Sequence, residues 1–178
     1  MWYILQVAAG SESCMKEKLE NLLEKKHVKN LVREVFYLLY EYSYKKSGVR
    51  QICTRVLFPG YLFLDMEEKS VRELEEYLEN MTEFHYMLST EKVCTPVSKE
   101  EQDFLEQHTS SGHTMRMSQG YMVGREVTIT EGAFASYRGE LKYVDRHNQY
   151  GVMSVQLGKR DVEMRFGLEI VWKEKESI

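Results

Sequence analysis

Six basic side chains in the last third of the sequence could grip the phosphates of a nucleic acid. They lie on expected strands and turns: Lys142, Arg146, His147, Lys159, Arg160 and Arg165. Lysine and arginine bind phosphate oxygens, and arginine can also read base edges in a groove. The alternative is an ordinary solvated β-surface, on which these side chains pair weakly with Asp145, Asp161 and Glu163. The residues by themselves leave both interpretations open.

A short loop between two glycines could present aromatic side chains to a partner. Its pattern is Gly132-x-Phe134-x-x-Tyr137-x-Gly139. Glycine adopts backbone angles that other residues avoid, so the two glycines are expected to bracket a fixed loop. Phe134 is either displayed there or fills the interior of a small β-barrel. Tyr137, followed by Arg138, is expected at the surface, where an aromatic ring can anchor a hydrophobic contact.

The sequence contains none of the patterns that would indicate catalysis or a bound cofactor. It has no Gly-x-Ser-x-Gly segment, no glycine-rich phosphate-binding loop and no metal-ligand pair of cysteines or histidines. Cys14, Cys53 and Cys94 are odd in number and widely spaced, which indicates reduced, buried thiols. We therefore expect a binding protein that is not an enzyme and needs no cofactor or metal.

The charge distribution limits how this chain can bind nucleic acid. Its formal charge is −4, and residues 120–178 hold nine basic and nine acidic residues, so the acidic excess lies before Gly120. Indiscriminate coating of nucleic acid needs many cations, so any contact must be local. The apolar run from Trp2 to Val7 is too short for a signal peptide or a membrane span. We expect a cytoplasmic monomer that does not contact a membrane.

The first 107 residues are expected to form an α/β sandwich, in which an antiparallel sheet is flanked by helices. Trp2 to Ala8 and the apolar alternation after Phe58-Pro59-Gly60 indicate strands. Three helices are expected to begin at serines that cap their first turns, and the last two have a glutamate three residues later. These serines are Ser11, Ser70 and Ser98.

The remaining segments predict a hairpin arm, a linker and a second domain. Residues 33–57 are rich in aromatic residues and turn at Ser47-Gly48, which indicates a long β-hairpin arm. The sequence leaves open whether this arm contacts DNA, polymerase or solvent. Residues 108–120 are small and polar, as in a linker, and residues 121–178 form short alternating segments typical of a small β-barrel. The expected fold class is α+β, with domains at 1–107 and 121–178.

Two segments together resemble the NusG family of transcription factors. The segment Phe58-Pro59-Gly60-Tyr61, with Trp2 near the start, is similar to the signature of the family's N-terminal domain. The segment from Val127 to Leu141 resembles its KOW motif. The resemblance implies an N-terminal domain that binds the coiled-coil clamp helices of RNA polymerase, with contributions from Trp2, Phe58 and Tyr61. It also implies a C-terminal KOW β-barrel.

Within that family, the segments 144–148 and 157–160 are most similar to the LoaP subgroup. This resemblance implies an operon-specific antiterminator whose KOW domain binds a structured hairpin in the nascent RNA. Resemblance to the housekeeping members of the family implies a different partner, Rho or a ribosomal protein, which would bind the loop of Phe134, Tyr137 and Arg138. This chain departs from them at Ala133, where they have proline, and at Arg138. A ribosome-associated or free RNA-binding module is a third possibility, of another class.

Overall fold

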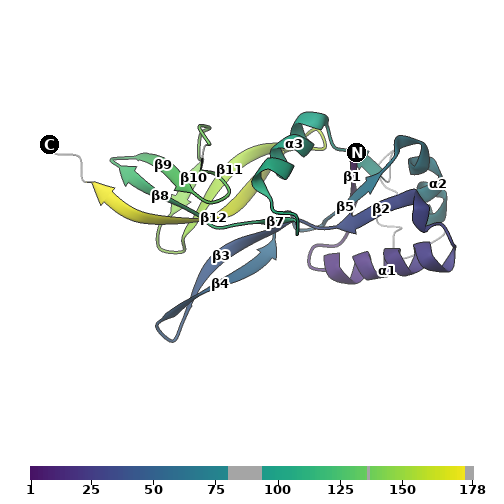
Figure 1. The fold of residues 1–178 in the computed structure, drawn as a ribbon, viewed down its shortest axis with the longest axis horizontal. Coiled ribbons are helices and arrows are strands. Elements are labelled where there is room, and N and C mark those ends of the chain that lie inside the picture. Colours follow the sequence, from purple (N-terminus) through teal and green to yellow (C-terminus); the bar gives the residue numbers. More distant parts are fainter. Residues whose placement is uncertain (80–93, 136, 175–178) are drawn as a thin grey trace. The chain divides into compact units, whose positions relative to one another are not determined.

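The computed structural model describes residues 1–79, 94–135 and 137–174 of the 178-residue chain (Figure 1). The chain forms two compact units. Unit 1 comprises Met1–Tyr37, Phe58–Asp103 and Leu157–Arg160, and unit 2 comprises Leu38–Leu57, Phe104–Gln156 and Asp161–Ile178. Each unit therefore combines segments that are far apart in the sequence.

Unit 1 contains a four-stranded antiparallel sheet in the order β2-β5-β1-β6. Its strands are β1 (Trp2–Gln6), β2 (Val32–Phe36), β5 (Tyr61–Met66) and β6 (Cys94–Pro96). The other elements are α1 (Glu12–Lys25), the 3-10 helix η1 (Lys29–Leu31), α2 (Glu68–Glu79) and the start of α3 (Lys99–His108). This arrangement agrees with the expected antiparallel sheet flanked by helices.

Side chains on β1 and β5 alternate between two apolar faces of this sheet, because successive residues of a strand point to opposite sides. Tyr3, Leu5 and Leu62 belong to a core cluster with Leu19 of α1 and Leu74 of α2. Burying this cluster is the main source of stability for the unit. The opposite face carries large aromatic residues instead, among them Trp2 and Phe63.

The helix starts only partly follow the expected serine caps. Ser98 and Glu101 form the reciprocal box: the Glu101 N–H donates to Ser98 Oγ at 3.2 Å, and the Ser98 N–H donates to Glu101 Oε2 at 2.8 Å. The Ser70 prediction was wrong, because α2 already begins at Glu68. The Ser11 prediction was also wrong, since its hydroxyl donates backwards to the Ala8 carbonyl at 2.6 Å and no side-chain cap is formed.

A buried carboxylate next to Ser11 binds backbone donors that lie outside the helix. Glu12 is only 3% exposed, and its Oε1 accepts N–H bonds from Gly10 at 3.0 Å and from Gly60 at 2.6 Å. Gly60 belongs to the Pro59-Gly60 turn and has a φ of 88°. Glu12 thus joins the end of the loop after β1 to the turn before β5, and it satisfies two backbone donors that would otherwise lose their hydrogen bonds on burial.

The expected hairpin arm is present in unit 2. It consists of β3 (Leu39–Lys46) and β4 (Val49–Val56), and β3 also pairs in parallel with β7 (Thr114–Met115). The turn residues Ser47 and Gly48 have φ values of 51° and 85°, as a two-residue hairpin turn requires. The arm is shorter than the predicted range 33–57, because residues 32–36 form β2 in unit 1.

The rest of unit 2 is rich in strands and carries a five-stranded sheet in the order β10-β11-β12-β8-β9. The strands are β8 (Ser118–Val123), β9 (Glu126–Glu131), β10 (Tyr143–Asp145), β11 (Tyr150–Leu157) and β12 (Arg160–Glu174). Phe134, Met153, Met164, Phe166 and Leu168 are fully buried and form its interior. The α+β fold class, with a β-rich C-terminal part, is confirmed.

The division into units does not coincide with the linear ranges 1–107, 108–120 and 121–178. The hairpin arm clusters with the C-terminal strands, and residues 108–120 contain β7 and the start of β8. Close backbone packing explains the clustering, since a Cβ at Gly167 would lie 2.3 Å from the Glu41 carbonyl oxygen. The Met117 N–H also donates to Glu41 Oε2 at 2.9 Å. The linear domain boundaries stay a prediction.

Candidate functional surfaces

The loop between Gly132 and Gly139 is built around a buried phenylalanine. Phe134 has no exposed surface, and its ring lies 4.4 Å from Phe166 and 5.5 Å from Tyr137, measured between centroids. Its N–H donates to Ser118 Oγ at 3.2 Å. Of the two roles that the sequence left open for Phe134, the structure therefore shows the packing role. Tyr137 is half-buried and Arg138 is exposed, so these two are the surface residues of the loop.

A buried histidine completes this aromatic cluster. The His108 ring stacks on Phe134 with centroids 4.4 Å apart, and its edge faces Phe104 at 4.7 Å. Its Nδ1 lies 2.6 Å from the Ala133 carbonyl oxygen, which fits a hydrogen bond donated by Nδ1–H. His108 thus links the last turn of α3 to the loop within unit 2. Sequence reasoning placed this residue at the start of a linker and missed it.

A basic groove lies between three segments of unit 2. Its volume is about 840 Å³, and it is lined by the turn after β8, by the start of β9, and by the chain from Arg138 into β10. Four cationic side chains line it against two acidic ones, Glu126 and Glu140. The four cations are Arg125, Arg138, Lys142 and Arg146. An excess of positive charge in a concave surface attracts polyanions such as nucleic acid.

The structure brings only some of the predicted RNA-binding residues to this groove. Lys142 and Arg146 line it, whereas His147 and Arg165 are exposed elsewhere in unit 2. Lys159 and Arg160 lie in the turn 157–160, which belongs to unit 1. Of the six predicted residues, two therefore line the groove.

Two residues of the groove were missed by sequence reasoning. Arg125 follows Gly124 in the turn between β8 and β9, and Tyr143 begins β10. The Gly124-Arg125 turn could have been noted, because turns place side chains in solvent. The exposure of Tyr143 depends on strand pairing, which no local pattern gives.

The acidic residues near the groove have partners of their own. Glu163 forms an ion pair with Lys142 at 3.2 Å, as the solvated-surface interpretation expects. Asp145 instead accepts hydrogen bonds from the Asn148 N–H and from its side-chain amide, both at 2.8 Å. These bonds from Asn148 are the main reason why the pKa of Asp145 is lowered. Asp145 therefore stabilises the turn before β11.

The second candidate site is the aromatic face of unit 1, formed by Trp2, Phe36, Phe58, Tyr61 and Phe63, and of these five only Tyr61 is more than 5% exposed. Phe36 and Phe63 stack with centroids 5.6 Å apart, and Trp2 meets both edge-on, at 4.9 and 5.9 Å. Trp2 and Phe58 are 5% and 3% exposed, so they are buried in the chain itself. Tyr61 remains half-exposed and packs edge-on against Phe58 at 6.5 Å.

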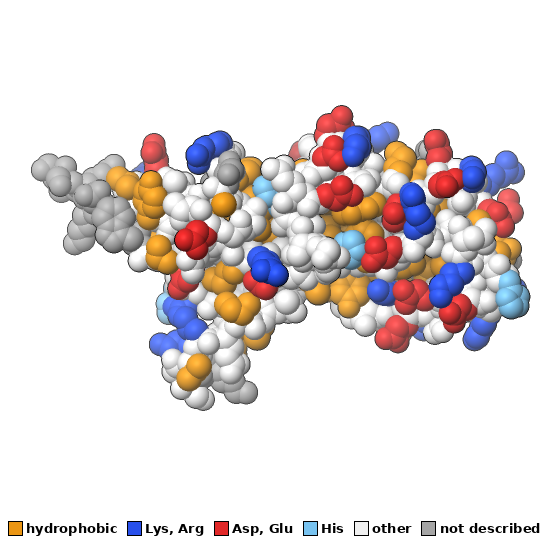
Figure 2. Space-filling model, viewed as in Figure 1, with side chains coloured by type: hydrophobic (Ala, Val, Ile, Leu, Met, Phe, Trp, Pro, Cys, Tyr) orange, Lys and Arg blue, Asp and Glu red, His pale blue; other side chains and the backbone are white. Residues whose placement is uncertain are grey.

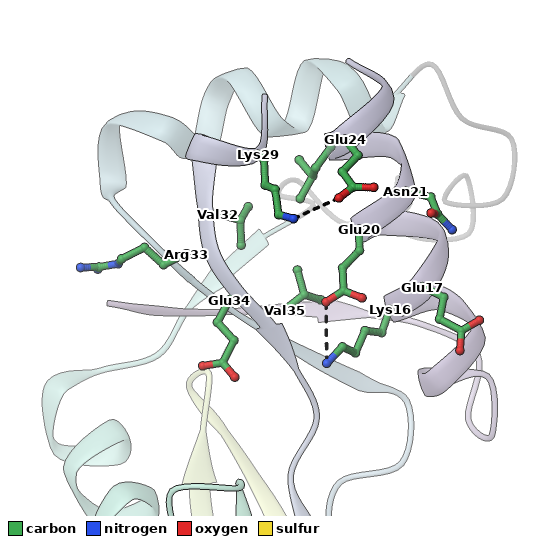
Figure 3. Close-up of a pocket in the computed structure, with 11 residues that line it drawn as sticks. Lys16, Glu17, Glu20, Asn21, Glu24, Lys29, Val32, Arg33, Glu34 and Val35 are labelled. Carbon is green, nitrogen blue, oxygen red and sulfur yellow. Dashed lines mark hydrogen bonds and ion pairs between the residues drawn. The ribbon is translucent and has the colours of Figure 1, made fainter. Parts of the chain in front are cut away.

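A pocket of about 560 Å³ lies between α1 and β2 (Figure 3). Its charges compensate one another: Lys29 pairs with Glu24 at 3.1 Å and Lys16 pairs with Glu20 at 3.7 Å. Charges of both signs are also interspersed over the visible face of unit 1 (Figure 2). Neither feature favours a particular ligand.

The hairpin arm carries exposed basic and apolar side chains. Residues 39–56 include four basic residues and one acidic residue. The Arg55 guanidinium lies 4.3 Å from the centroid of the Tyr42 ring, a cation–π contact along one face of the arm. Tyr44, Val49 and Ile52 are each at least half-exposed. The arm thus combines basic and apolar surface.

The three cysteines are free thiols, and Cys94 is buried as expected, whereas Cys14 is exposed, so the expectation of a buried thiol was wrong there. No three His, Cys, Asp or Glu side chains within the described ranges are grouped so that they could hold a metal ion. Burial raises the pKa of the Cys94 thiol to about 12, so this thiol is protonated at neutral pH and is a poor nucleophile. Among the helices in the described ranges, none has the length and apolar character needed to cross a membrane.

Comparison with known proteins shows which sequences this chain is similar to. The family described as "Transcription termination factor nusG" matches residues 1–106. The transcription termination/antitermination protein NusG of Haemophilus influenzae is 30% identical, with 93% of this chain and 91% of that protein aligned. The NusG protein of Campylobacter jejuni is 23% identical, with 99% and 97% aligned.

The fold also has a counterpart among solved structures. A structure described as "Domain interaction in Thermotoga maritima NusG" aligns over 93% of this chain and 92% of that one, with a TM-score of 0.51 and 22% identity. At this identity the likeness shows the fold alone. The family match over more than half of the chain and the similarity to full-length relatives establish the assignment. This chain belongs to the NusG family of transcription termination and antitermination factors.

Proposed function

We propose that this chain is a specialised antitermination and processivity factor, with one surface for RNA polymerase and another for structured nascent RNA. The basic groove of unit 2 is the observation that carries the proposal. It gathers four cationic side chains against two acidic ones within a chain whose net charge is −4. A local cationic site in an acidic protein binds a polyanion at one place and avoids general coating of nucleic acid.

The RNA-binding role is tested by removing charge from the groove. Replacing Arg125, Lys142 and Arg146 together with alanine is expected to weaken binding of the leader RNA of the gene's own operon by about tenfold or more. The slope of log affinity against log salt should fall by about one for each phosphate that the variant no longer binds. Affinity is measured by fluorescence anisotropy of labelled RNA over a range of salt concentrations.

The control variant for this experiment removes positive charge from a position outside the groove. Lys159 and Arg160 are exposed but lie in the turn 157–160 of unit 1, outside the groove. Changing both to alanine should leave affinity and salt slope unaltered. If the control weakens binding and the groove variant does not, the RNA site lies at the turn and the groove assignment is wrong.

We further propose that the aromatic face of unit 1 binds the coiled-coil clamp helices of RNA polymerase. Trp2 and Phe58 are buried, so in this arrangement they support the site without direct contact. Tyr61 is the half-exposed member, and its ring rests on Phe58. A tyrosine held in place by buried neighbours loses little entropy when it binds, which suits an interface anchor.

Replacing Tyr61 with alanine is expected to weaken binding of a clamp-helix peptide by about tenfold, the usual effect of losing one aromatic anchor. Isothermal titration with the peptide measures the effect. Tyr77→Ala is the matched control, because Tyr77 is also half-buried but lies on α2 against the core cluster. Equal loss of binding in both variants would point to a general stability effect and would count against the Tyr61 site.

One observation favours a second candidate, in which the C-terminal part binds a protein such as Rho or a ribosomal protein. Tyr137 and Arg138 line a pocket of about 390 Å³ together with Ala133, Gln107 and His108. A half-exposed aromatic side chain beside a pocket is typical of a protein interface. If the groove variant binds its leader RNA normally and Tyr137→Ala abolishes binding of Rho or of a ribosomal protein, the general elongation factor is the better description.

A further inference from the structure

Two tyrosines and an arginine form an aromatic patch on the strands next to the basic groove. The patch consists of Tyr143 on β10, Tyr150 on β11 and Arg165 on β12. Tyr143 pairs with Val152 and Asp145 pairs with Tyr150, so the two tyrosines are diagonal neighbours on one face. Their ring centroids are 6.2 Å apart.

Within the patch, the Tyr150 ring is covered on one face and the Tyr143 ring is exposed. The Arg165 guanidinium lies 4.3 Å from the centroid of the Tyr150 ring, so it covers one face of this half-buried tyrosine. Tyr143 is 55% exposed, although an aromatic side chain gains free energy from burial. Tyr143 also lines the basic groove and therefore lies between the patch and the cations.

We infer that Tyr143 stacks against an unpaired base of the RNA held in the groove, beside the platform formed by Tyr150 and Arg165. This inference rests on the proposed RNA-binding function and specifies which part of an RNA the site takes. Aromatic rings and guanidinium planes are the two kinds of side-chain surface on which bases stack. The cations of the groove would hold the phosphates next to that base.

The flat ring selects unpaired nucleotides, because a base inside a helix is already stacked on both faces. A bulge, a loop or an end offers a base that can stack on protein without breaking a pair. The groove alone would bind a paired stem through its phosphates, without preference for sequence. The patch would then give a preference for stems that are interrupted or closed by unpaired nucleotides.

The full-length chain can be tested with two RNA probes that differ at one nucleotide. One is a blunt RNA duplex, and the other is the same duplex with a single bulged 2-aminopurine, whose fluorescence is quenched when it stacks. We expect the chain to bind the bulged duplex about tenfold more tightly and to quench its fluorescence, in line with the usual effect of one base–aromatic stack. Tyr143→Ala should abolish both the preference and the quenching.

Three comparisons separate stacking from a structural effect. Tyr143→Phe keeps the ring and should retain the preference. Tyr44→Ala removes a tyrosine of similar exposure, 50%, from the hairpin arm and should behave as the unaltered chain does. The salt dependence of Tyr143→Ala binding should not change, because stacking releases no counterions.

Failure of the stacking inference and failure of the proposed RNA-binding function give different results in this experiment. If the chain binds both duplexes with equal affinity and Tyr143→Ala changes neither, the stacking inference is wrong and RNA binding by the groove stands. If the chain binds neither duplex even at low salt, the proposed RNA-binding function is itself rejected. Loss of the preference in Tyr143→Phe as well would show that the ring is not what the RNA contacts.

Discussion

Replacing Gly132 with alanine is expected to destabilise unit 2 by about 3 to 5 kcal/mol, in the range typical of severe backbone conflicts. Gly132 has a φ of 87°, a value that alanine tolerates poorly. A Cβ there would also lie 2.3 Å from the Met117 carbonyl oxygen and 2.5 Å from the Ser118 Cα. Both neighbours are backbone atoms, so they cannot rotate away. Urea denaturation, together with hydrogen exchange of peptides from β8 and β9, measures the loss.

Gly10 offers a control that separates the two causes. It has the same φ of 87°, but a Cβ there would have no neighbour within 4 Å. Gly10→Ala should therefore cost only the conformational strain, about 1 to 2 kcal/mol. Equal losses of stability in the two variants would show that the close approach of the loop to the chain before β8 contributes nothing.

Replacing Phe134 with alanine is expected to reduce the free energy of unfolding by about 3 to 5 kcal/mol, as is typical of a large ring removed from a core. Phe134 is fully buried and contacts Phe166 and His108, both at 4.4 Å between centroids. The cavity would lie between the loop and the sheet, where neighbours on several elements cannot all close it. Thermal and urea unfolding of the full chain measure the effect.

Tyr137→Ala is the matched variant in the same loop. Its ring is half-buried, so we expect a loss of about 1 kcal/mol, close to the average for a single substitution. Weaker binding of any partner by Phe134→Ala would follow from this loss of packing, whereas weaker binding by Tyr137→Ala would report a contact. If Phe134→Ala is as stable as Tyr137→Ala, the ring does not fill the interior.

Sequence alone determined those features that depend on neighbours a few residues apart. The capping box of Ser98 and Glu101 formed as expected, because both partners lie within one helical turn. The hairpin turn at Ser47-Gly48 also formed, since the residues of the turn set its backbone angles. The two segments that resemble family motifs are local patterns as well, and the assignment to the NusG family was confirmed.

The caps at Ser11 and Ser70 were predicted wrongly because the sequence pattern shows neither the partner of a serine hydroxyl nor the residue at which a helix begins. At the first helix, the Ser11 hydroxyl donates to the Ala8 carbonyl, and the neighbouring Glu12 carboxylate accepts from the Gly60 N–H, forty-eight residues away, and not from the first turn of the helix. At the second helix, the chain became helical before Ser70, so this serine has no free helix end to cap. A local pattern cannot show that a better acceptor or an earlier start exists.

The functional surfaces depended on tertiary structure to an even greater extent. Six basic residues looked like one cluster in the sequence, yet Lys159 and Arg160 belong to unit 1 while Lys142 and Arg146 line the groove in unit 2. Arg125 joins that groove from a turn seventeen residues before Lys142. Which side chains share a groove is set by how strands pair, and pairing joins residues that are distant in sequence.

The eight-residue loop that contains Phe134 and Tyr137 also has some features set by local sequence and others set by tertiary packing. The spacing of its glycines and aromatic residues was enough to identify the loop, because the backbone angles of glycine are a local property. Only the packed structure decided that Phe134 faces inward and that Tyr137 stays half-exposed. Burial depends on what the rest of the chain places against a side chain, and for Phe134 those neighbours come from α3 and β12.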